Sequence, residues 1–198
     1  MSLVSAILIA AGESSRMGRL KPLLPWRGTP LVEYQVASLI DGGASEVVVV
    51  LGHRHEEVTP FVSGQGVRFV VNPSYRVGKT TSIKAGIRDL DPKTTDILLL
   101  AVDQPRPPRI IDAVLRSHLR SAALITSPRY AGRGGHPLAF ASALRAELEA
   151  ITEEGQGIRE VLLAHEAEVN AVPIDDPIVR VDINTAEDYE KALARYGT

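Results

Sequence analysis

Short runs of apolar residues recur along this chain, and each run is apolar throughout instead of alternating with polar residues. The runs are Leu3–Ala10, Val47–Leu51, Val67–Val71, Ile97–Val102 and Ala122–Thr126. Continuous apolar runs of this length are typical of strands that are buried on both faces of a mostly parallel sheet. Amphipathic stretches separate them, so the alternation predicts an α/β fold: a three-layer, mostly parallel, doubly wound sheet of Rossmann-like type.

Capping signals and helical spacing predict where the intervening helices lie. Thr29-Pro30 reads as an N-cap followed by a first-turn proline, with a helix that runs to about Asp41 and ends at Gly42-Gly43. Further helical faces are predicted from apolar positions, namely Ile83/Ile87/Leu90, Ile110/Ile111/Val114/Leu115/Leu119 and Ile158/Val161/Leu162.

The last third of the chain is less regular. Val169–Ile174 and Ile178–Val181 are predicted to be two edge strands, and a final helix is predicted from about Asn184. Asn184 or Thr185 would cap that helix, with Glu187 placed for a capping box to Asn184.

Composition limits the classes of function. The 198 residues are expected to form a single domain, residues 1–198, with an ordinary soluble composition. A net charge of −2 argues against a nucleic-acid-binding surface, so any phosphate site must be local. The absence of cysteine excludes disulfides and thiol chemistry. No basic, apolar leader and no apolar run of membrane length is evident, so no membrane association is expected and the cytoplasm is the expected location.

The loop after the first apolar run carries the strongest chemical signal. Gly12 ends the run, and Arg16 and Lys21 follow in a segment with few large apolar side chains. Clustered backbone N–H groups with Arg and Lys form a concave anion site, and the predicted ligand is a phosphate chain. The spacing of Gly12 and Gly18 excludes the dinucleotide fingerprint, and Pro73 excludes a Walker A motif ending at Gly78-Lys79-Thr80. A mobile loop that is polar only because it is exposed is the alternative.

Polar residues also follow the other predicted strands, at Gly52-His53, Asn72-Pro73 and Asp103. In open α/β sheets the ligand crevice lies beyond the carboxyl ends of the strands, so these segments are expected to converge. A carboxylate at Asp103 suits Mg²⁺, which keeps several waters and binds substrate phosphates. The competing interpretation of Asp103 is an N-cap of the proline-started helix that follows it.

Several motifs in this loop resemble a known family. Ala10-Ala11-Gly12, Ser15-Arg16-Met17-Gly18 and Lys21-Pro22-Leu23-Leu24 resemble the signature loop of the MobA-like nucleotidyltransferases. The AAG opening and the continuation through Trp26 are most similar to the molybdenum cofactor cytidylyltransferase branch, because the guanylyltransferase branch usually has a second glycine where this chain has Ala11.

The resemblance extends to Tyr196 and implies roles for further residues. Asp103 matches the family's metal-binding Asp-x-Pro motif, and Asp182, in the closing D-I-N-T-A-E-D-Y motif, would complete the Mg²⁺ site. Gly135 and His136 match an element associated with the acceptor side of the pocket, although a structural turn is the alternative there. Ser82 either contacts the nucleotide or caps its own helix. The nucleotide-binding set implied by the resemblance is Ala10, Ala11, Gly12, Ser15, Arg16, Lys21, Asn72, Gly78 and Ser82.

The resulting hypothesis is an Mg²⁺-dependent cytidylyltransferase. A terminal phosphate of molybdopterin would attack the α-phosphorus of CTP, and pyrophosphate would leave. Arg16 and Lys21 would neutralise the developing negative charge, and Asp103 would hold the metal; these three are the predicted catalytic residues. The alternatives are transfer from another nucleoside triphosphate or to a sugar phosphate, and a non-catalytic chaperone that delivers a pterin cofactor to a molybdenum hydroxylase.

Overall fold

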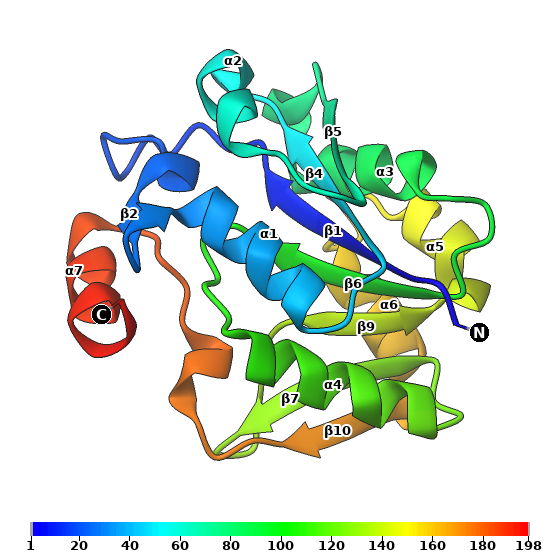
Figure 1. Cartoon of the computed structure of the whole chain (residues 1–198). Coiled ribbons are helices and arrows are strands. Elements are labelled where there is room, and N and C mark those ends of the chain that lie inside the picture. The colour runs from blue at the N-terminus through cyan, green and yellow to red at the C-terminus, as the bar shows by residue number, and fades with distance from the viewer. Residues whose placement is uncertain (1, 198) are drawn as a thin grey trace.

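The structure is a computed structural model that describes residues 2–197. Its main sheet has the order β10-β7-β9-β6-β1-β4-β5, and β8 pairs with β7 outside that path (Figure 1). The strands are β1 Val4–Ala10, β4 Glu46–Leu51, β5 Val67–Val71, β6 Asp96–Ala101, β7 Ile125–Tyr130, β8 Arg133–Gly134, β9 Leu138–Ala141 and β10 Val169–Pro173. A separate two-residue ladder joins β2, Pro25–Trp26, to β3, Thr29–Pro30. The predicted mostly parallel, doubly wound sheet is confirmed; the pairs that involve β8 and β9 are the antiparallel exceptions.

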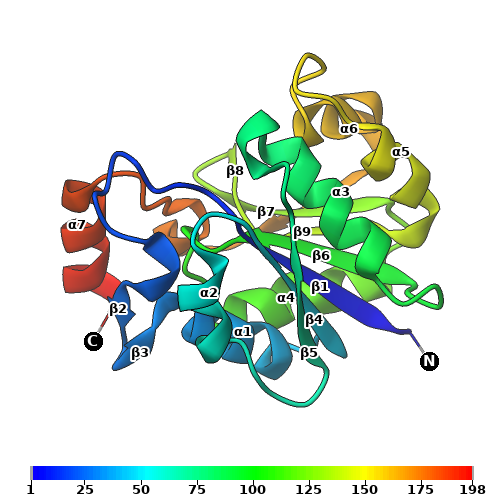
Figure 2. The same cartoon turned by 90° about the horizontal axis from the view of Figure 1, so that it is seen from above.

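Helices cover both faces of this sheet, which gives three layers (Figures 1 and 2). They are α1 Leu31–Asp41, α2 His55–Val58, α3 Lys79–Asp89, α4 Pro108–Arg120, α5 Arg145–Ala150, α6 Ile158–Ala164 and α7 Ala186–Tyr196. Helices α1 and α4 lie on one face, and α3, α5 and α6 lie on the other (Figure 2). None of the helices between residues 2 and 197 combines the length and apolar character needed to cross a bilayer.

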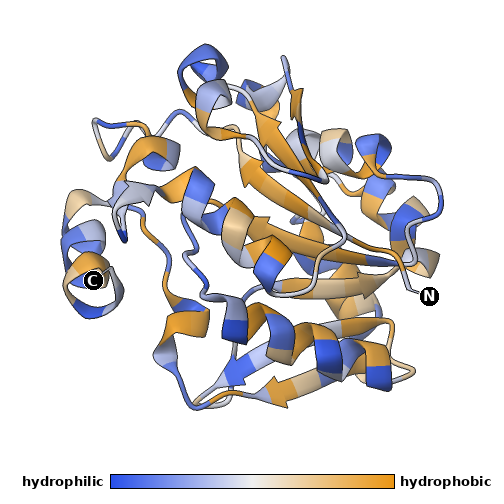
Figure 3. Cartoon of the chain, viewed as in Figure 1, coloured by the Kyte–Doolittle hydropathy of each residue, from blue (hydrophilic) through white to orange (hydrophobic). Residues whose placement is uncertain are grey.

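Strand β1 contributes to both layers of the core. Its side chains alternate, so Ala6 and Leu8 pack in the core beneath α1 and α4, whereas Ile7 and Ile9 pack in the core beneath α3 and α5. The central strands are accordingly among the most apolar elements of the molecule (Figure 3). This explains why β1 is apolar at every position, as strands buried on two faces are.

The strand register brings the carboxyl ends of β1, β4 and β6 together. Ile9 pairs with Ala101 on β6, and Ala10 pairs with Leu51 on β4, both in parallel. The chain leaves β1 and returns first as β4 and later as β6, on opposite sides of β1. The β1/β6 boundary is therefore the switch point at which α/β sheets open a ligand crevice.

Several boundaries differ from the sequence predictions. Strand β7 begins at Ile125, three residues later than predicted, and β5 is an edge strand whose Phe69 is exposed, so burial on both faces is wrong for Val67–Val71. The strand predicted at Ile178–Val181 is wrong as well. That segment is a 3₁₀ helix, Pro177–Arg180, because the Asp176 carboxylate accepts a hydrogen bond from the Ile178 N–H (2.9 Å) and caps the turn.

Helix capping also differs in detail. Thr29 lies in β3 and makes no capping bond, and helix α1 begins at Leu31. Helix α7 is capped by Thr185, whose hydroxyl accepts a hydrogen bond from the Asp188 N–H (3.1 Å). The Asp188 carboxylate in turn accepts a hydrogen bond from the Thr185 N–H. The capping box is thus Thr185/Asp188 instead of Asn184/Glu187, which leaves the Asn184 side chain available for other contacts.

A buried arginine joins the C-terminal segment to the sheet. Arg106 is fully buried in the loop between β6 and α4, and its guanidinium donates to the backbone carbonyls of Pro105, His136, Val179 and Val181, at 2.9–3.0 Å. Burial lowers the pKa of Arg106 to about 10, and nearby carboxylates oppose that shift. This one side chain fixes the path of residues 179–181 and so positions the segment that follows them.

His136 is one of the residues whose backbone carbonyl accepts a hydrogen bond from Arg106. Burial, together with the positive charges of Arg106 and Lys79, lowers the pKa of His136 to about 3. The imidazole is therefore neutral at physiological pH. A proton can be placed on it in the folded state only at a cost in stability.

Replacement of Arg106 by methionine should lower the free energy of unfolding by about 3 kcal/mol or more, because several buried carbonyls lose their donor. The matched control is Arg109→Met in the first turn of α4, which removes an ion pair between the exposed Arg109 side chain and Asp176 and should cost under about 1 kcal/mol. Urea unfolding of the two variants tests this. Equal losses in both would contradict a stapling role for Arg106.

The buried His136 should make the free energy of unfolding depend on pH below neutrality. Between its folded pKa of about 3 and the ordinary 6.5, the unfolded chain binds more protons, so stability falls as the pH falls through this range. From pH 7 to pH 5 this group costs the native state about 2 kcal/mol. His136→Gln should lose correspondingly less stability than the wild type over the same interval in urea titrations. Equal losses of stability in the two proteins would refute the assignment of this pH dependence to His136.

Candidate active site

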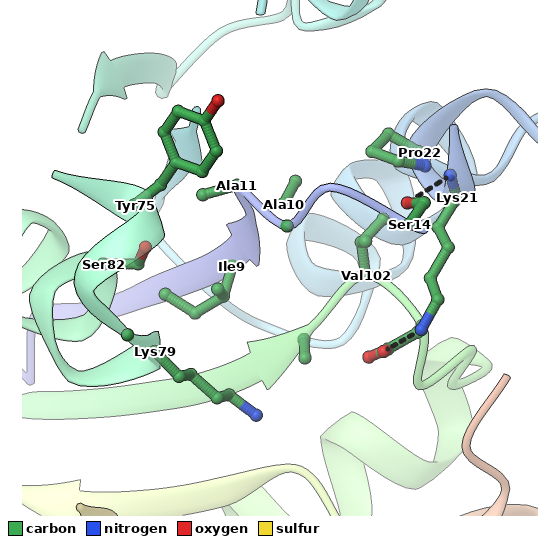
Figure 4. A pocket seen from close by; sticks show the side chains of 14 residues that line it. Ile9, Ala10, Ala11, Ser14, Lys21, Pro22, Tyr75, Lys79, Ser82 and Val102 are labelled. Atoms are coloured by element: carbon green, nitrogen blue, oxygen red, sulfur yellow. Dashed lines mark hydrogen bonds and ion pairs between the residues drawn. The ribbon is translucent and has the colours of Figure 1, made fainter. Parts of the chain in front are cut away.

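A cavity of about 250 Å³ opens at the β1/β6 switch point (Figure 4). Its lining combines the end of β1, the loop that follows it, the start of α3 and the end of β6. The residues concerned are Ile9, Ala10, Ala11, Gly12, Ser14, Lys21, Pro22, Tyr75, Gly78, Lys79, Ser82, Ala101, Val102 and Asp103. Most of the predicted nucleotide-binding residues thus surround one space, although Ser15, Arg16 and Asn72 do not line it.

An ion pair between Lys21 and Asp103 crosses the mouth of the crevice. The Lys21 Nζ lies 2.8 Å from the Asp103 Oδ2, and the two side chains are 12% and 26% exposed. Lys21 begins a 3₁₀ turn, Lys21–Leu23, and its N–H donates to the Ser14 hydroxyl at 3.1 Å (Figure 4). Each partner satisfies the other's charge, and neither is sealed from solvent. Asp103 is not a helix cap, because α4 begins beyond Pro107.

Asn184 connects the same ion pair to Arg16. The Asn184 Oδ1 lies 3.4 Å from the Lys21 Nζ and 3.4 Å from the Arg16 Nη2. The amide oxygen therefore gathers both cations of the signature loop at one edge of the crevice. The sequence predicts only a possible helix cap at Asn184. Its position two residues after Asp182 in the closing motif is the one signal that could have indicated a place at the site.

The signature loop borders open space at Gly12. A Cβ built on Gly12 would meet no atom within 4 Å, so the space above this residue is open. Ser14, at a φ of 56°, turns into the cavity, whereas Ser15 is exposed and does not line it. The loop thus lines the cavity with Gly12 and Ser14 at the end of β1, where a phosphate-binding loop would lie.

Asn72 and Ser82 form a buried pair beneath the cavity. The Asn72 side-chain amide donates to the hydroxyls of Ser82 (3.0 Å) and Thr81 (2.9 Å), and its carbonyl oxygen accepts from the Ser74 N–H (3.0 Å). All of these bonds are internal, so Asn72 positions the β5–α3 turn. Ser82 lies in the second turn of α3, lines the cavity and does not cap its helix.

The N-terminus of α3 forms the opposite wall. Gly78 has a φ of 153°, and a Cβ there would clash with the Glu153 carboxylate, which itself accepts a hydrogen bond from the Thr80 N–H (2.6 Å). A side chain at Gly78 would therefore be strained by this φ and would also force the Glu153 side chain to move. Lys79 is exposed, and it lines both this cavity and a second cavity next to it.

The second cavity has a volume of about 240 Å³ and includes His136 in its wall. Gly135 does not line it, and a Cβ on Gly135 would clash with the carbonyl oxygen of Val179. The His136 N–H donates to the same oxygen at 2.9 Å. The glycine thus permits the close backbone contact that places His136 at the cavity.

The carboxylates do not form a preassembled metal site. Residues 2–197 contain no group of three or more His, Cys, Asp or Glu side chains that could hold a metal ion. Asp182 is exposed, and its chain is tied to Asp103 through the hydrogen bond from the Ile183 N–H to the Asp103 carbonyl (2.8 Å). One carboxylate beside a phosphate site is nevertheless the usual protein contribution for Mg²⁺, which takes its remaining ligands from substrate phosphates and water.

Comparison with known proteins gives related sequences and folds. The model of the MobA-like NTP transferase domain matches residues 6–169. A nicotine blue oxidoreductase from Paenarthrobacter nicotinovorans is 32% identical, over 96% of this chain and 96% of that protein. A molybdenum cofactor cytidylyltransferase from Escherichia coli is 28% identical, over 99% of this chain and 98% of that protein.

Solved structures agree with these relatives. A nucleotidyl transferase from Methanothermobacter has a TM-score of 0.83 and 27% identity, over 98% of this chain and 97% of that one. A Mycobacterium tuberculosis protein solved in complex with manganese has a TM-score of 0.81 and 25% identity, over 98% of both chains. The domain match, the relatives and the shared fold lead to one conclusion: this chain belongs to the MobA-like NTP transferase family.

Proposed function

We propose that this protein transfers CMP from CTP to the terminal phosphate of a molybdopterin-type acceptor, with Mg²⁺ as cofactor and pyrophosphate as the second product. The observation that carries the proposal is the Lys21–Asp103 ion pair at the switch point, directly beside the open amides of the signature loop. We also propose that the chain acts as a single domain in the cytoplasm. Support for cytidine and molybdopterin comes from the E. coli relative, which is a molybdenum cofactor cytidylyltransferase.

The reaction is a substitution at phosphorus. An oxygen of the acceptor phosphate forms a bond to the α-phosphorus of CTP, and the bond from that phosphorus to the bridging oxygen of the β-phosphate breaks. The electron pair leaves with pyrophosphate. Because the acceptor phosphate is already ionised near neutral pH, the step needs no general base. Positioning and charge neutralisation are sufficient.

The chain supplies that neutralisation from the signature loop. The Lys21 Nζ exchanges its bond to Asp103 for an α-phosphate oxygen, and Arg16 approaches the departing β- and γ-phosphates. Asn184 holds both cations at the edge of the crevice before the substrate arrives. The amides of Ala10, Ala11 and Gly12 receive the triphosphate from the strand side.

The residues present fit Mg²⁺, which the Asp103 carboxylate would hold. Asp182 would be a second ligand, because its neighbour Ile183 is hydrogen-bonded to the backbone of Asp103. When bound, the ion supplies Lewis-acid stabilisation of the phosphate oxygens. When the ion pair opens, the Asp103 carboxylate would become available to Mg²⁺ and the Lys21 ammonium group to the phosphate. The manganese bound by the mycobacterial structure supports a divalent ion in this fold.

A second candidate function follows from the nicotine blue oxidoreductase, which is the more similar of the two relatives reported above. Reduction of such a substrate requires an electron donor, and a nicotinamide dinucleotide is the usual one. The loop after β1 lacks the spacing of a dinucleotide-binding fingerprint, since five residues lie between Gly12 and Gly18. We therefore favour nucleotidyl transfer.

Turnover should depend on the ion pair. With CTP, Mg²⁺ and purified molybdopterin, Lys21→Ala and Asp103→Asn should each lower kcat/KM for pyrophosphate release by about 100-fold or more. Lys191→Ala and Glu187→Gln, which break an exposed ion pair on α7, are the matched controls and should leave the rate unchanged. Pterin binding without pyrophosphate release would instead indicate a chaperone. Reduction of nicotine blue by a reduced nicotinamide dinucleotide would indicate the oxidoreductase.

The choice of base is tested separately by thermal shift. CTP with Mg²⁺ should raise the Tm more than GTP, ATP or UTP at equal concentration, because ligands that bind only the folded state stabilise it by mass action. The shift should shrink when EDTA replaces Mg²⁺ and in Asp103→Asn. If GTP alone stabilised the protein, the cytidylyl assignment would fall while nucleotidyl transfer would stand.

A further inference from the structure

The nucleotide cavity joins a second cavity at the start of α3. Two residues line both spaces, namely Lys79 and Ala101. Ala101 ends β6 and has only a methyl side chain, so Lys79 is the one charged residue between residues 2 and 197 that the two cavities share. Figure 4 shows the Lys79 side chain reaching from α3 into the nucleotide cavity, on the side opposite Lys21.

Lys79 has no acidic partner in the part of the chain that the structure describes. It is exposed, and none of the ion pairs between residues 2 and 197 includes it. Lys21, across the cavity, is by contrast held by the Asp103 carboxylate at 2.8 Å. Exposed lysines are common on protein surfaces, and what distinguishes Lys79 is its position between two cavities. Its ammonium group can bind an anion there without the loss of a native ion pair.

The helix end beside Lys79 is already occupied. The Glu153 carboxylate accepts a hydrogen bond from the Thr80 N–H at 2.6 Å, and a Cβ on Gly78 would overlap this carboxylate. That amide of the first turn is therefore not open to a phosphate, although helix N-termini commonly bind anions. A phosphate at the junction of the cavities must be met by a side chain, and Lys79 is the cation that α3 supplies. Its charge also acts in the second cavity, since it is among those that lower the pKa of His136.

The proposed reaction brings two anionic phosphates together at this junction. Like charges repel strongly where water is partly excluded, so the attack of one phosphate on another requires cations beside both. Lys21 and Arg16 serve the α-phosphate and the leaving pyrophosphate from the signature loop, and neither lines the second cavity. Arg159 lines the second cavity but not the first, so it is not at the junction.

We propose that Lys79 is a further catalytic residue, whose ammonium group contacts both the α-phosphate of the nucleotide and the attacking phosphate of the acceptor. The acceptor oxygen forms its bond to the α-phosphorus, the bond from that phosphorus to the bridging oxygen breaks, and the electron pair leaves with pyrophosphate. Lys79 keeps its protons throughout and contributes charge alone. The inference rests on the proposed function for the identity of the two phosphates. After the step, the same contact holds the product, a nucleoside diphosphate ester.

Turnover distinguishes this role from that of a solvated surface lysine. With CTP, Mg²⁺ and purified molybdopterin, Lys79→Met should lower kcat for pyrophosphate release about 30-fold or more, whereas Lys79→Arg, which keeps the charge, should stay within about 5-fold of the wild type. Lys84→Met, which removes a lysine of the same helix that lines neither cavity, is the matched control and should leave kcat unchanged. The Tm of each variant checks its folding. If Lys79→Met were as active as Lys84→Met, the proposal would be overturned.

Binding of the product class tests the contact without turnover. Calorimetry compares CTP with CDP-glycerol, a cytidine diphosphate ester whose second phosphate lies on the acceptor side and which has no pterin. Lys79→Met should raise the Kd of CDP-glycerol about 10-fold or more but that of CTP less than about 3-fold, because the β- and γ-phosphates of CTP lie at the signature loop. If the thermal shift selects another nucleotide, the corresponding diphosphate ester replaces CDP-glycerol.

The two ligands also separate this inference from the proposed function. An ester that bound Lys79→Met and the wild type equally, or that did not bind the wild type, would overturn the contact. Equal losses for CTP and the ester would overturn it too, because Lys79 would then serve the triphosphate alone. Ester binding that depends on Lys79, in a protein that releases no pyrophosphate, would leave the contact standing and remove the proposed function.

Discussion

The parallel register of β1 with β4 and β6 is the constraint on which the site depends. Because Ile9 pairs with Ala101 and Ala10 with Leu51, the segments after these strands must leave the sheet at the same level. Gly12 and Asp103 then line the same cavity at the switch point, where the Lys21 side chain contacts the Asp103 carboxylate. A slip of one residue would exchange the two buried faces of β1, which pack against different helices.

Charge balance follows from that geometry. A protein with a net charge of −2 cannot attract a triphosphate by its overall field, so the cations must be concentrated where the ligand binds. In the unliganded protein Lys21 is held by Asp103 and by Asn184. These contacts keep a cation in the crevice without leaving it unpaired. Under the proposed function, these partly exposed contacts would be exchanged for contacts to phosphates and a divalent ion.

The sequence predicts those parts of the fold whose cause is local. Continuous apolar runs located the parallel strands, and Gly42-Gly43 located the end of α1. Strand β9 could not be placed, because its antiparallel position between β6 and β7 depends on partners distant in the chain. The turn at Pro177–Arg180 was mistaken for a strand because its apolar residues mask the Asp176 cap.

The site shows the same division. The signature loop and Asp103 were identified from the sequence because residue type and order carry their chemistry. The distinction among arginines could not be made in this way. Arg106 donates to four backbone carbonyls, Arg129 is half-buried with its Nε unpaired, and Arg133 is exposed, yet nothing in the local sequence separates them. Only tertiary packing decides which guanidinium is structural and which remains free to bind.

That distinction bears on how one fold serves different reactions. The staple of Arg106 fixes the backbone at His136 and Val181, so the segments on either side of the cavities are rigid irrespective of the ligand. Side chains that line only the second cavity can then vary without loss of the nucleotide site, because β1, the signature loop and Asp103 are held by the central strands. The divergent names of the relatives, a cytidylyltransferase and an oxidoreductase, are in keeping with a constant crevice joined to a variable one. Under the proposed function, specificity for the acceptor would then lie in the last third of the chain, which the apolar strand pattern describes least.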